Sequence, residues 1–137
     1  MSLVLDASMA VCWVVPDEAN PAANTILAQV LDQGAVVPCH WRLEVASVLR
    51  AAVRRRRCDQ AHVDNSLARL TRLPIFVDDQ TSHRAWSDTM ALAVSEDLTP
   101  YDAAYLELAL RMADPLATLD NALIRAARRR GAEVFSA

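Results

Sequence analysis

The chain has 137 residues, 53% of them hydrophobic, and its 14 basic and 17 acidic side chains give a formal net charge of -3. This length and apolar content fit one domain, residues 1–137, and the charge balance gives no overall field that marks a nucleic-acid partner, although arginine clusters leave RNA open. No segment reaches the roughly 18 apolar residues of a membrane span, and the first residues lack a signal peptide's basic region, so we expect a cytoplasmic protein without membrane contact.

The cysteine pattern limits the kinds of cross-link that the chain can use. Cys12, Cys39 and Cys58 are odd in number and too widely spaced for a CxxC pair. This argues against both a zinc knuckle and a disulfide framework. We therefore expect three reduced thiols, as in a cytosolic protein.

Short strands and helices alternate along the chain. Apolar runs cut off by acids, prolines or glycines predict strands at residues 3–5, 35–37, 75–77, 116–119 and 133–135. Apolar residues at helical spacing, bounded by capping residues, predict helices at residues 21–31, 41–57, 59–70, 82–94, from 99 onward, and 121–130. This alternation predicts an α/β fold, a three-layer α/β/α sandwich with a mainly parallel central sheet of about four to five strands.

Four segments each place one carboxylate in an otherwise apolar or helix-opening context. They are VLDAS at Asp6, WRLEVASVL at Glu44, TPYDAAYLELA at Asp102 and ATLDNALIRAA at Asp120. Asp6 and Asp120 directly follow predicted strands, at the carboxyl ends where open α/β sheets bind ligands. A carboxylate is costly to bury unless a cation or several donors meet it, so four of them indicate a shared cation, most simply a metal ion.

Each of these acids also has a purely structural interpretation. Asp6 and Asp120 fit the N-cap position of a helix, and Thr99 to Asp102 resembles a capping box with Asp in place of Glu. The structural alternative for Glu44 is a salt bridge to a nearby arginine. Because four coincident structural roles are much rarer than one, we favour a common site.

Several other phosphate chemistries lack their residues here. The only glycines are Gly34 and Gly131, so neither GxGxxG nor a Walker loop exists. All 14 basic residues are arginine, whereas receiver domains and most aspartyl-phosphate hydrolases place a lysine beside their acids. We therefore interpret Asp78 and Asp79 as a solvated pair at a strand end.

The histidines provide no evident general base. His40, His62 and His83 share no metal-ligand spacing, and we expect surface or packing roles for them. Phosphoryl transfer can proceed without a protein general base when two divalent ions are bound. The ions lower the pKa of a water and stabilise the entering and leaving oxygens. Carboxylate oxygens favour Mg²⁺ or Mn²⁺ over zinc.

The order of the motifs resembles a known family. VLDAS, then LEVASVL after Pro38, LTPYDAAYLELA, LATLDNAL and a closing RRRGAEVF resemble the PIN-domain ribonucleases, specifically the VapC toxins of bacterial toxin–antitoxin pairs, over essentially the whole chain. The resemblance implies a PIN fold and an Mg²⁺- or Mn²⁺-dependent endoribonuclease that cleaves single-stranded RNA. It implies a homodimer silenced by a cognate VapB-like antitoxin.

The same resemblance assigns roles to particular residues. It implies that four acids are catalytic and bind the metal: Asp6, Glu44, Asp102 and Asp120. It implies that the hydroxyls of Ser8, in D-x-S, and Thr118, in T-x-D, support these acids.

Two questions stay open at the level of sequence. Residues 54–57 and 128–130 are arginine clusters that either complement the ends of helices in solvent or follow an RNA backbone, in which case the contacts are Arg54, Arg55, Arg128 and Arg129. The alternative function is a catalytically inactive PIN-like binding or assembly module. The intact set of four acids favours the enzyme.

Overall fold

Five parallel strands form the centre of the protein. The computed structural model describes residues 2–136. Within them lie β1 (Leu3–Leu5), β2 (Ala35–Val37), β3 (Ile75–Val77), β4 (Leu116–Ala117) and β5 (Val134–Phe135). They form one sheet in the order β3-β2-β1-β4-β5, and every pairing is parallel. The predicted α/β class and parallel sheet are confirmed.

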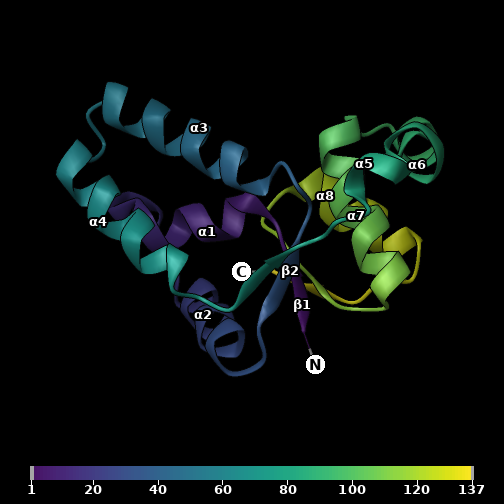
Figure 1. Cartoon of the computed structure of the whole chain (residues 1–137), viewed down its shortest axis with the longest axis horizontal. Helices are drawn as coiled ribbons and strands as arrows, with labels where there is room; N and C mark the ends of the chain where they lie inside the picture. Colours follow the sequence, from purple (N-terminus) through teal and green to yellow (C-terminus); the bar gives the residue numbers. More distant parts are fainter. Residues whose placement is uncertain (1, 137) are drawn as a thin grey trace.

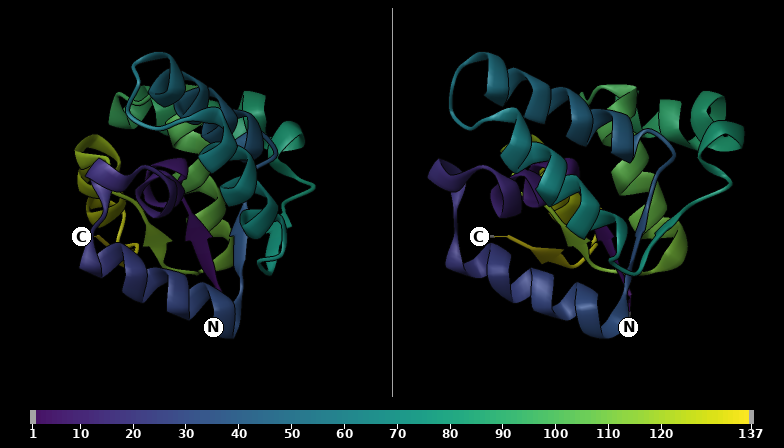
Figure 2. Two further views of the ribbon diagram at one scale, coloured as in Figure 1. Left: turned by 90° about the vertical axis from the view of Figure 1, so that its left-hand side faces the viewer. Right: turned by 60° about the vertical axis from the view of Figure 1, so that its left-hand side comes forward.

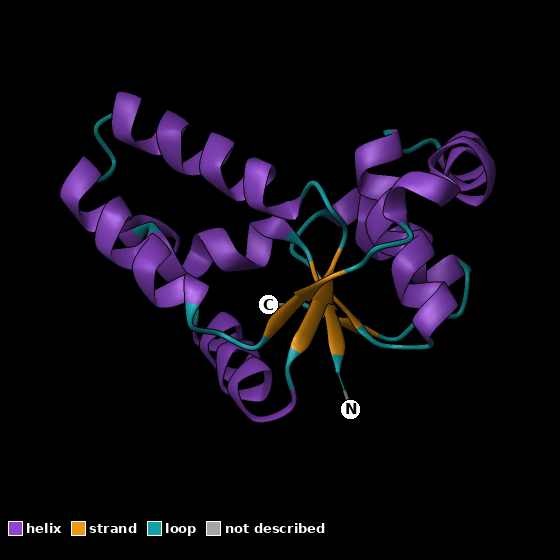
Figure 3. Cartoon of the chain, in the orientation of Figure 1, coloured by secondary structure: helices purple, strands orange, loops and turns teal. Residues whose placement is uncertain are grey.

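Helices cover both faces of this sheet, which gives three layers (Figures 1 and 3). One layer contains α1 (Ala7–Val14), α2 (Pro21–Gln33), α3 (Trp41–Arg54) and α4 (Gln60–Thr71), with a short 3-10 turn η1 (Pro16–Glu18). The other contains α5 (Thr81–Arg84), η2 (Ala85–Thr89), α6 (Met90–Glu96), α7 (Pro100–Met112) and α8 (Asn121–Arg129). Figure 2 shows α3 and α4 running beside each other at the outside of their layer.

Local signals in the sequence set the helix ends. The side chain of Asn20 caps α2, and Pro21 occupies the first helical position, where a missing N–H is harmless. Gly34 ends this helix at φ +81°, and a Cβ there would lie 3.2 Å from the carbonyl oxygen of Pro74. Asp59 caps α4 by accepting from the N–H of His62. The turn at Gly34 brings β2 back beside β1, and α4 leads on to β3.

The topology places a crevice at the carboxyl ends of β1 and β4. The chain first builds β2 and β3 on one side of β1 and then crosses to the other side for β4 and β5. From β1 it enters α1 in one helix layer, whereas from β4 it enters α8 in the other (Figure 1). In open α/β sheets this reversal of strand order is where ligands bind.

Burial follows the position of each strand in the sheet. All of β1 is fully buried, as are Leu116 and Ala117 of β4, whereas Phe76 of the edge strand β3 is exposed. Buried strands of a parallel sheet read as continuous apolar runs, which is the pattern of residues 3–5. In the part of the chain that the structure describes, no helix is long and apolar enough to cross a membrane.

Two expectations about residues 78–96 are wrong. The helix predicted over 82–94 is interrupted by the π-helical turn η2, and α6 continues to Glu96, where Asp97 adopts a left-handed φ of 54°. Asp78 is not solvated: it accepts two hydrogen bonds from Arg111, of 3.1 and 2.8 Å, and one of 2.9 Å from Thr81. Arg111 reaches it from α7, which sequence spacing does not reveal.

Candidate active site

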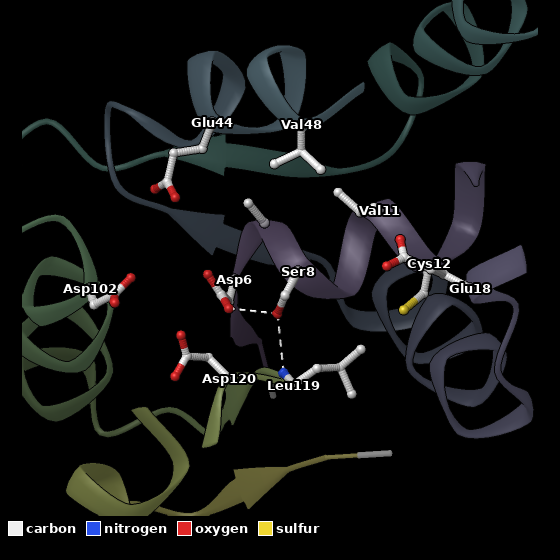
Figure 4. Close-up of a pocket in the computed structure, with 11 residues that line it drawn as sticks. Asp6, Ser8, Val11, Cys12, Glu18, Glu44, Val48, Asp102, Leu119 and Asp120 are labelled. Carbon is white, nitrogen blue, oxygen red and sulfur yellow. Dashed lines mark hydrogen bonds between the residues drawn. The ribbon is translucent and has the colours of Figure 1, made fainter. Parts of the chain in front are cut away.

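The four acids singled out in the sequence line one cavity at the carboxyl edge of the sheet (Figure 4). The cavity has a volume of about 380 Å³. Asp6 follows β1, Glu44 lies in the first turn of α3, Asp102 lies in the first turn of α7, and Asp120 follows β4. Parallel strands and the helices that follow them therefore bring four distant segments to one place.

Asp6 lies at the centre of the group and does not act as a helix cap. It occupies the N-cap position of α1, but its side chain makes no capping hydrogen bond. Instead, its Oδ2 accepts a hydrogen bond of 2.6 Å from Ser8 and one of 2.7 Å from Thr118. Only 5% of the residue is exposed. Burial raises the pKa of the Asp6 carboxyl, the two hydroxyls oppose this, and repulsion from Glu44 and Asp120 adds to it.

The same two hydroxyls join the ends of β1 and β4. Ser8 Oγ accepts a hydrogen bond of 3.1 Å from the backbone N–H of Leu119. Thr118 Oγ1 accepts one of 3.0 Å from the N–H of Asp120. Each hydroxyl thus receives a backbone proton and donates its own to Asp6. The carboxylate is held firmly between the two strands.

Glu44 is fixed by two partners that sequence reasoning did not identify. Its Oε1 accepts a hydrogen bond of 2.8 Å from the Tyr105 phenol and lies 2.9 Å from His40 Nε2. Although burial opposes ionisation, these two contacts hold the pKa of Glu44 below its ordinary value. The expected surface or packing role for His40 is therefore incomplete. The sequence feature that could have indicated this contact is the i,i+4 spacing of His40 and Glu44, which places both side chains on one face of α3.

Asp102 and Asp120 occupy the first positions of two helices. The Asp120 side chain does cap α8, since it accepts a hydrogen bond of 3.1 Å from the N–H of Leu123. For α7 the cap is Thr99, which accepts from the N–H of Asp102 and leaves that carboxylate to the cavity. Burial, with repulsion from the other three acids, raises the pKa of Asp102 to about 6. Asp120 therefore both caps α8 and lines the cavity.

The donor set fits a hard divalent cation. Every acid at this end of the cavity offers carboxylate oxygen, the ligand type that Mg²⁺ and Mn²⁺ prefer. Burial first, and repulsion from neighbouring acids second, raise the pKa values of Asp6 and Asp102, and a bound cation would offset both effects. Among residues 2–136, no three His, Cys, Asp or Glu side chains already meet closely enough to hold an ion. The four acids stand apart from one another around one end of the cavity, and repulsion between them favours this spacing.

The arginine clusters differ in their contacts. Arg129 donates a hydrogen bond of 2.9 Å to Glu96, and Arg130 donates one of 2.6 Å to Ser95. Arg129 thus has a structural partner, whereas Arg54, Arg55 and Arg128 stay exposed.

Comparison with known proteins identifies the family. The family model described as PIN domain matches residues 3–129. The chain belongs to the PIN-domain family. It is 30% identical over 123 residues to Ribonuclease VapC3 of Pyrobaculum aerophilum, a match that covers 90% of this chain and 92% of that protein, so this PIN domain is of the VapC type. The crystal structure of PAE2754 from the same organism has the same fold, with a TM-score of 0.71 at 21% identity, covering 98% of this chain and 90% of that one.

Proposed function

We propose that this PIN-domain protein is an Mg²⁺- or Mn²⁺-dependent endoribonuclease that hydrolyses phosphodiester bonds of RNA. The observation that carries the proposal is the convergence of Asp6, Glu44, Asp102 and Asp120 on one cavity. The family membership and the name of the relative, Ribonuclease VapC3, support it. We assign these four residues as the metal-binding and catalytic group.

The side chains around the cavity have defined tasks in this mechanism. A divalent ion held there by the acids would lower the pKa of a bound water and offset negative charge on the phosphate. Asp6 and Glu44 are the two preorganised ligands, because Ser8 and Thr118 hold one oxygen of Asp6 and Tyr105 and His40 hold one of Glu44. The second oxygen of each accepts no hydrogen bond from residues 2–136 and is free to coordinate. Such supporting contacts fix ligand geometry.

Asp102 and Asp120 complete the set at the same end of the cavity (Figure 4). Both precede or begin helices, whose N-terminal N–H groups carry partial positive charge. This charge offsets part of the repulsion among the acids and also favours an approaching phosphate. The N-termini of α7 and α8 therefore lie at the end of the cavity where the acids and the phosphate of the RNA would meet.

We also propose that the protein acts as the toxin of a toxin–antitoxin pair. Its partners are then an RNA substrate, a cognate VapB-like antitoxin that blocks the acidic cavity, and a second copy of the chain. The relation to a VapC protein supports this role. Expression of the chain alone should arrest growth, and co-expression of the neighbouring small reading frame should relieve the arrest.

RNA cleavage by the purified protein tests the enzymatic proposal. The wild type should cleave single-stranded RNA with Mg²⁺ or Mn²⁺ and lose this activity in EDTA. Asp6→Asn and Asp102→Asn should each abolish cleavage, while Asp79→Asn, a matched change of an exposed acid outside the cavity, should keep it. Cleavage by the Asn variants or in EDTA would contradict the mechanism. A folded wild type that binds RNA without cutting it would favour the inactive binding module.

A further inference from the structure

The cavity extends well beyond the four acids. Its remaining walls come mostly from small or apolar side chains of α1, α3 and the segment after β4: Ala7, Val11, Cys12, Val48 and Leu119. In Figure 4 the acids gather at one end, the apolar side chains line the middle, and Glu18 stands at the opposite end beside Cys12. The cavity is thus one slot with a metal-binding end, an apolar middle and a lone carboxylate at its far end.

Glu18 is held in place from a separate part of the fold. It belongs to η1, which Pro16 starts directly after α1. Its Oε1 lies 3.4 Å from Nη2 of Arg57, which also donates a hydrogen bond of 2.6 Å to Asp17. Glu18 lines the cavity beside Cys12 (Figure 4). With 40% of its side chain exposed, Glu18 keeps acceptor capacity toward the cavity.

We propose that the apolar part of this cavity is a subsite for a guanine base of the RNA, with Glu18 accepting hydrogen bonds from the Watson–Crick edge of that base. The proposal rests on the proposed ribonuclease function, because it takes the acidic end as the position of the phosphate. The volume of the whole cavity, about 380 Å³, is in the range of small-molecule sites. Apolar walls accept the faces of any base, so the discrimination falls to Glu18.

The chemistry of an ionised carboxylate selects among the bases. A carboxylate only accepts hydrogen bonds, and it does so with two oxygens. Guanine presents two adjacent donors, N1–H and the N2 amino group, which match these oxygens. Adenine and cytosine present an amino group next to an acceptor nitrogen. Uracil presents one N–H between two carbonyl oxygens that would face the carboxylate. The expected order of affinity is guanine first, adenine and cytosine next, and uracil last.

The four nucleoside 5′-monophosphates are suitable probes, because they carry a phosphate and one base but no bond for the enzyme to cut. Binding is measured by calorimetry in Mn²⁺ for the wild type, Glu18→Gln and Glu133→Gln. The last is a matched control, since Glu133 is exposed and lies outside the cavity. Glutamine replaces one acceptor oxygen by a donor and so removes the preference for a donor–donor edge.

We expect the wild type and Glu133→Gln to bind GMP about tenfold more tightly than UMP, the discrimination of one two-bond contact to a base. In Glu18→Gln this ratio should fall to about threefold or less. Three results would contradict the guanine subsite: equal binding of all four probes by the wild type, no binding at all, or an unchanged ratio in Glu18→Gln. The apolar part of the cavity would then be better explained as a contact surface for a protein segment. Base discrimination without RNA cleavage would instead refute the ribonuclease while the subsite stood, and cleavage without discrimination would refute the subsite alone.

Discussion

The phenol of Tyr105 on α7 donates a hydrogen bond of 2.8 Å to Oε1 of Glu44 on α3. This contact joins the two helix layers, because α3 and α7 lie on opposite sides of the sheet (Figure 1). Tyr105 is fully buried and lies three residues after Asp102, so one face of α7 supplies an acid and also fixes another acid. His40 holds the same oxygen of Glu44, which leaves the other one for a cation.

Removal of this phenol should weaken metal binding with little effect on the fold. Tyr105→Phe keeps the buried ring and deletes one hydrogen bond, so the free energy of unfolding should fall by about 1 kcal/mol. Affinity for Mn²⁺, measured by electron paramagnetic resonance, should fall by about tenfold, since supporting contacts orient metal ligands. Tyr101→Phe is the matched control, because Tyr101 is exposed and its hydroxyl is not bonded to Glu44. Equal Mn²⁺ affinity in Tyr105→Phe and the wild type would contradict the positioning role.

The raised pKa of Asp102 predicts how the metal-free protein responds to pH. In the folded state this pKa is about 6, above its ordinary value of 3.8, so the folded protein holds the proton more tightly than the unfolded chain. The stabilising contribution of protonated Asp102 is complete below about pH 4 and is lost as the pH rises through 6. In EDTA at pH 7.5, Asp102→Asn should therefore be more stable than the wild type.

We expect this gain to be about 1 kcal/mol after allowance for solvent screening, or a few degrees in Tm. Thermal unfolding in EDTA from pH 4 to pH 8 measures it. The gain should vanish near pH 4, where the wild-type Asp102 carboxyl is also neutral. A variant that is less stable than the wild type at pH 7.5 would show that Asp102 experiences no net repulsion.

Arg111 neutralises two buried acids away from the cavity. It donates to Asp78 and also to Glu107, at 2.8 Å from Nε to Oε1. Arg111→Met should destabilise the protein by about 3–5 kcal/mol, because it leaves Asp78 buried without a cation and Glu107 with only Arg84, at 3.6 Å. Asp88→Asn, which removes the exposed partner of Arg84, should cost about 1 kcal/mol or less. Urea unfolding compares them, and equal losses would contradict the importance of burial.

The lowered pKa of Asp78 predicts an acid-sensitive contribution from the same pair. Burial opposes ionisation of Asp78, but the hydrogen bonds from Arg111 and Thr81 outweigh it and hold the pKa below 3.8. This contribution is present above the ordinary pKa and is lost as the pH falls through the lowered one. The wild type should thus lose stability below about pH 4 more steeply than Arg111→Met in urea titrations.

An exposed apolar row on α6 and the turn before it predicts the surface through which two copies pair. Trp86 is 93% exposed, and Met90 and Val94 follow at spacings of four residues and are also exposed. We propose that a second copy covers this row. Trp86→Ser should then shift sedimentation toward the monomer. Leu31→Ser on α2, in the opposite helix layer, should not. A monomeric wild type would contradict the proposed homodimer.

Local sequence patterns predicted much of the fold and part of the candidate site. The apolar runs at residues 3–5, 35–37 and 75–77 have the same bounds as strands β1, β2 and β3. The acids Asp6 and Asp120 could be picked out because each directly follows a strand, and a strand end has a known place in a parallel sheet. The α2 helix begins at Pro21 as predicted, whereas it runs to Gln33, directly before Gly34, and not only to the predicted Leu31.

The amino-acid sequence by itself determined the order of the elements, the parallel sheet and the four acids, because these depend on periodicity and on neighbours in the chain. Only the tertiary structure decided which side chains meet. Tyr105 and Glu44 are 61 residues apart, and Arg111 and Asp78 are 33 apart. Such contacts arise from the crossing of helices over a twisted sheet, where a side chain's partner depends on packing and not on spacing. For this reason sequence spacing does not predict that Arg111 binds Asp78, or that Tyr105 contacts Glu44.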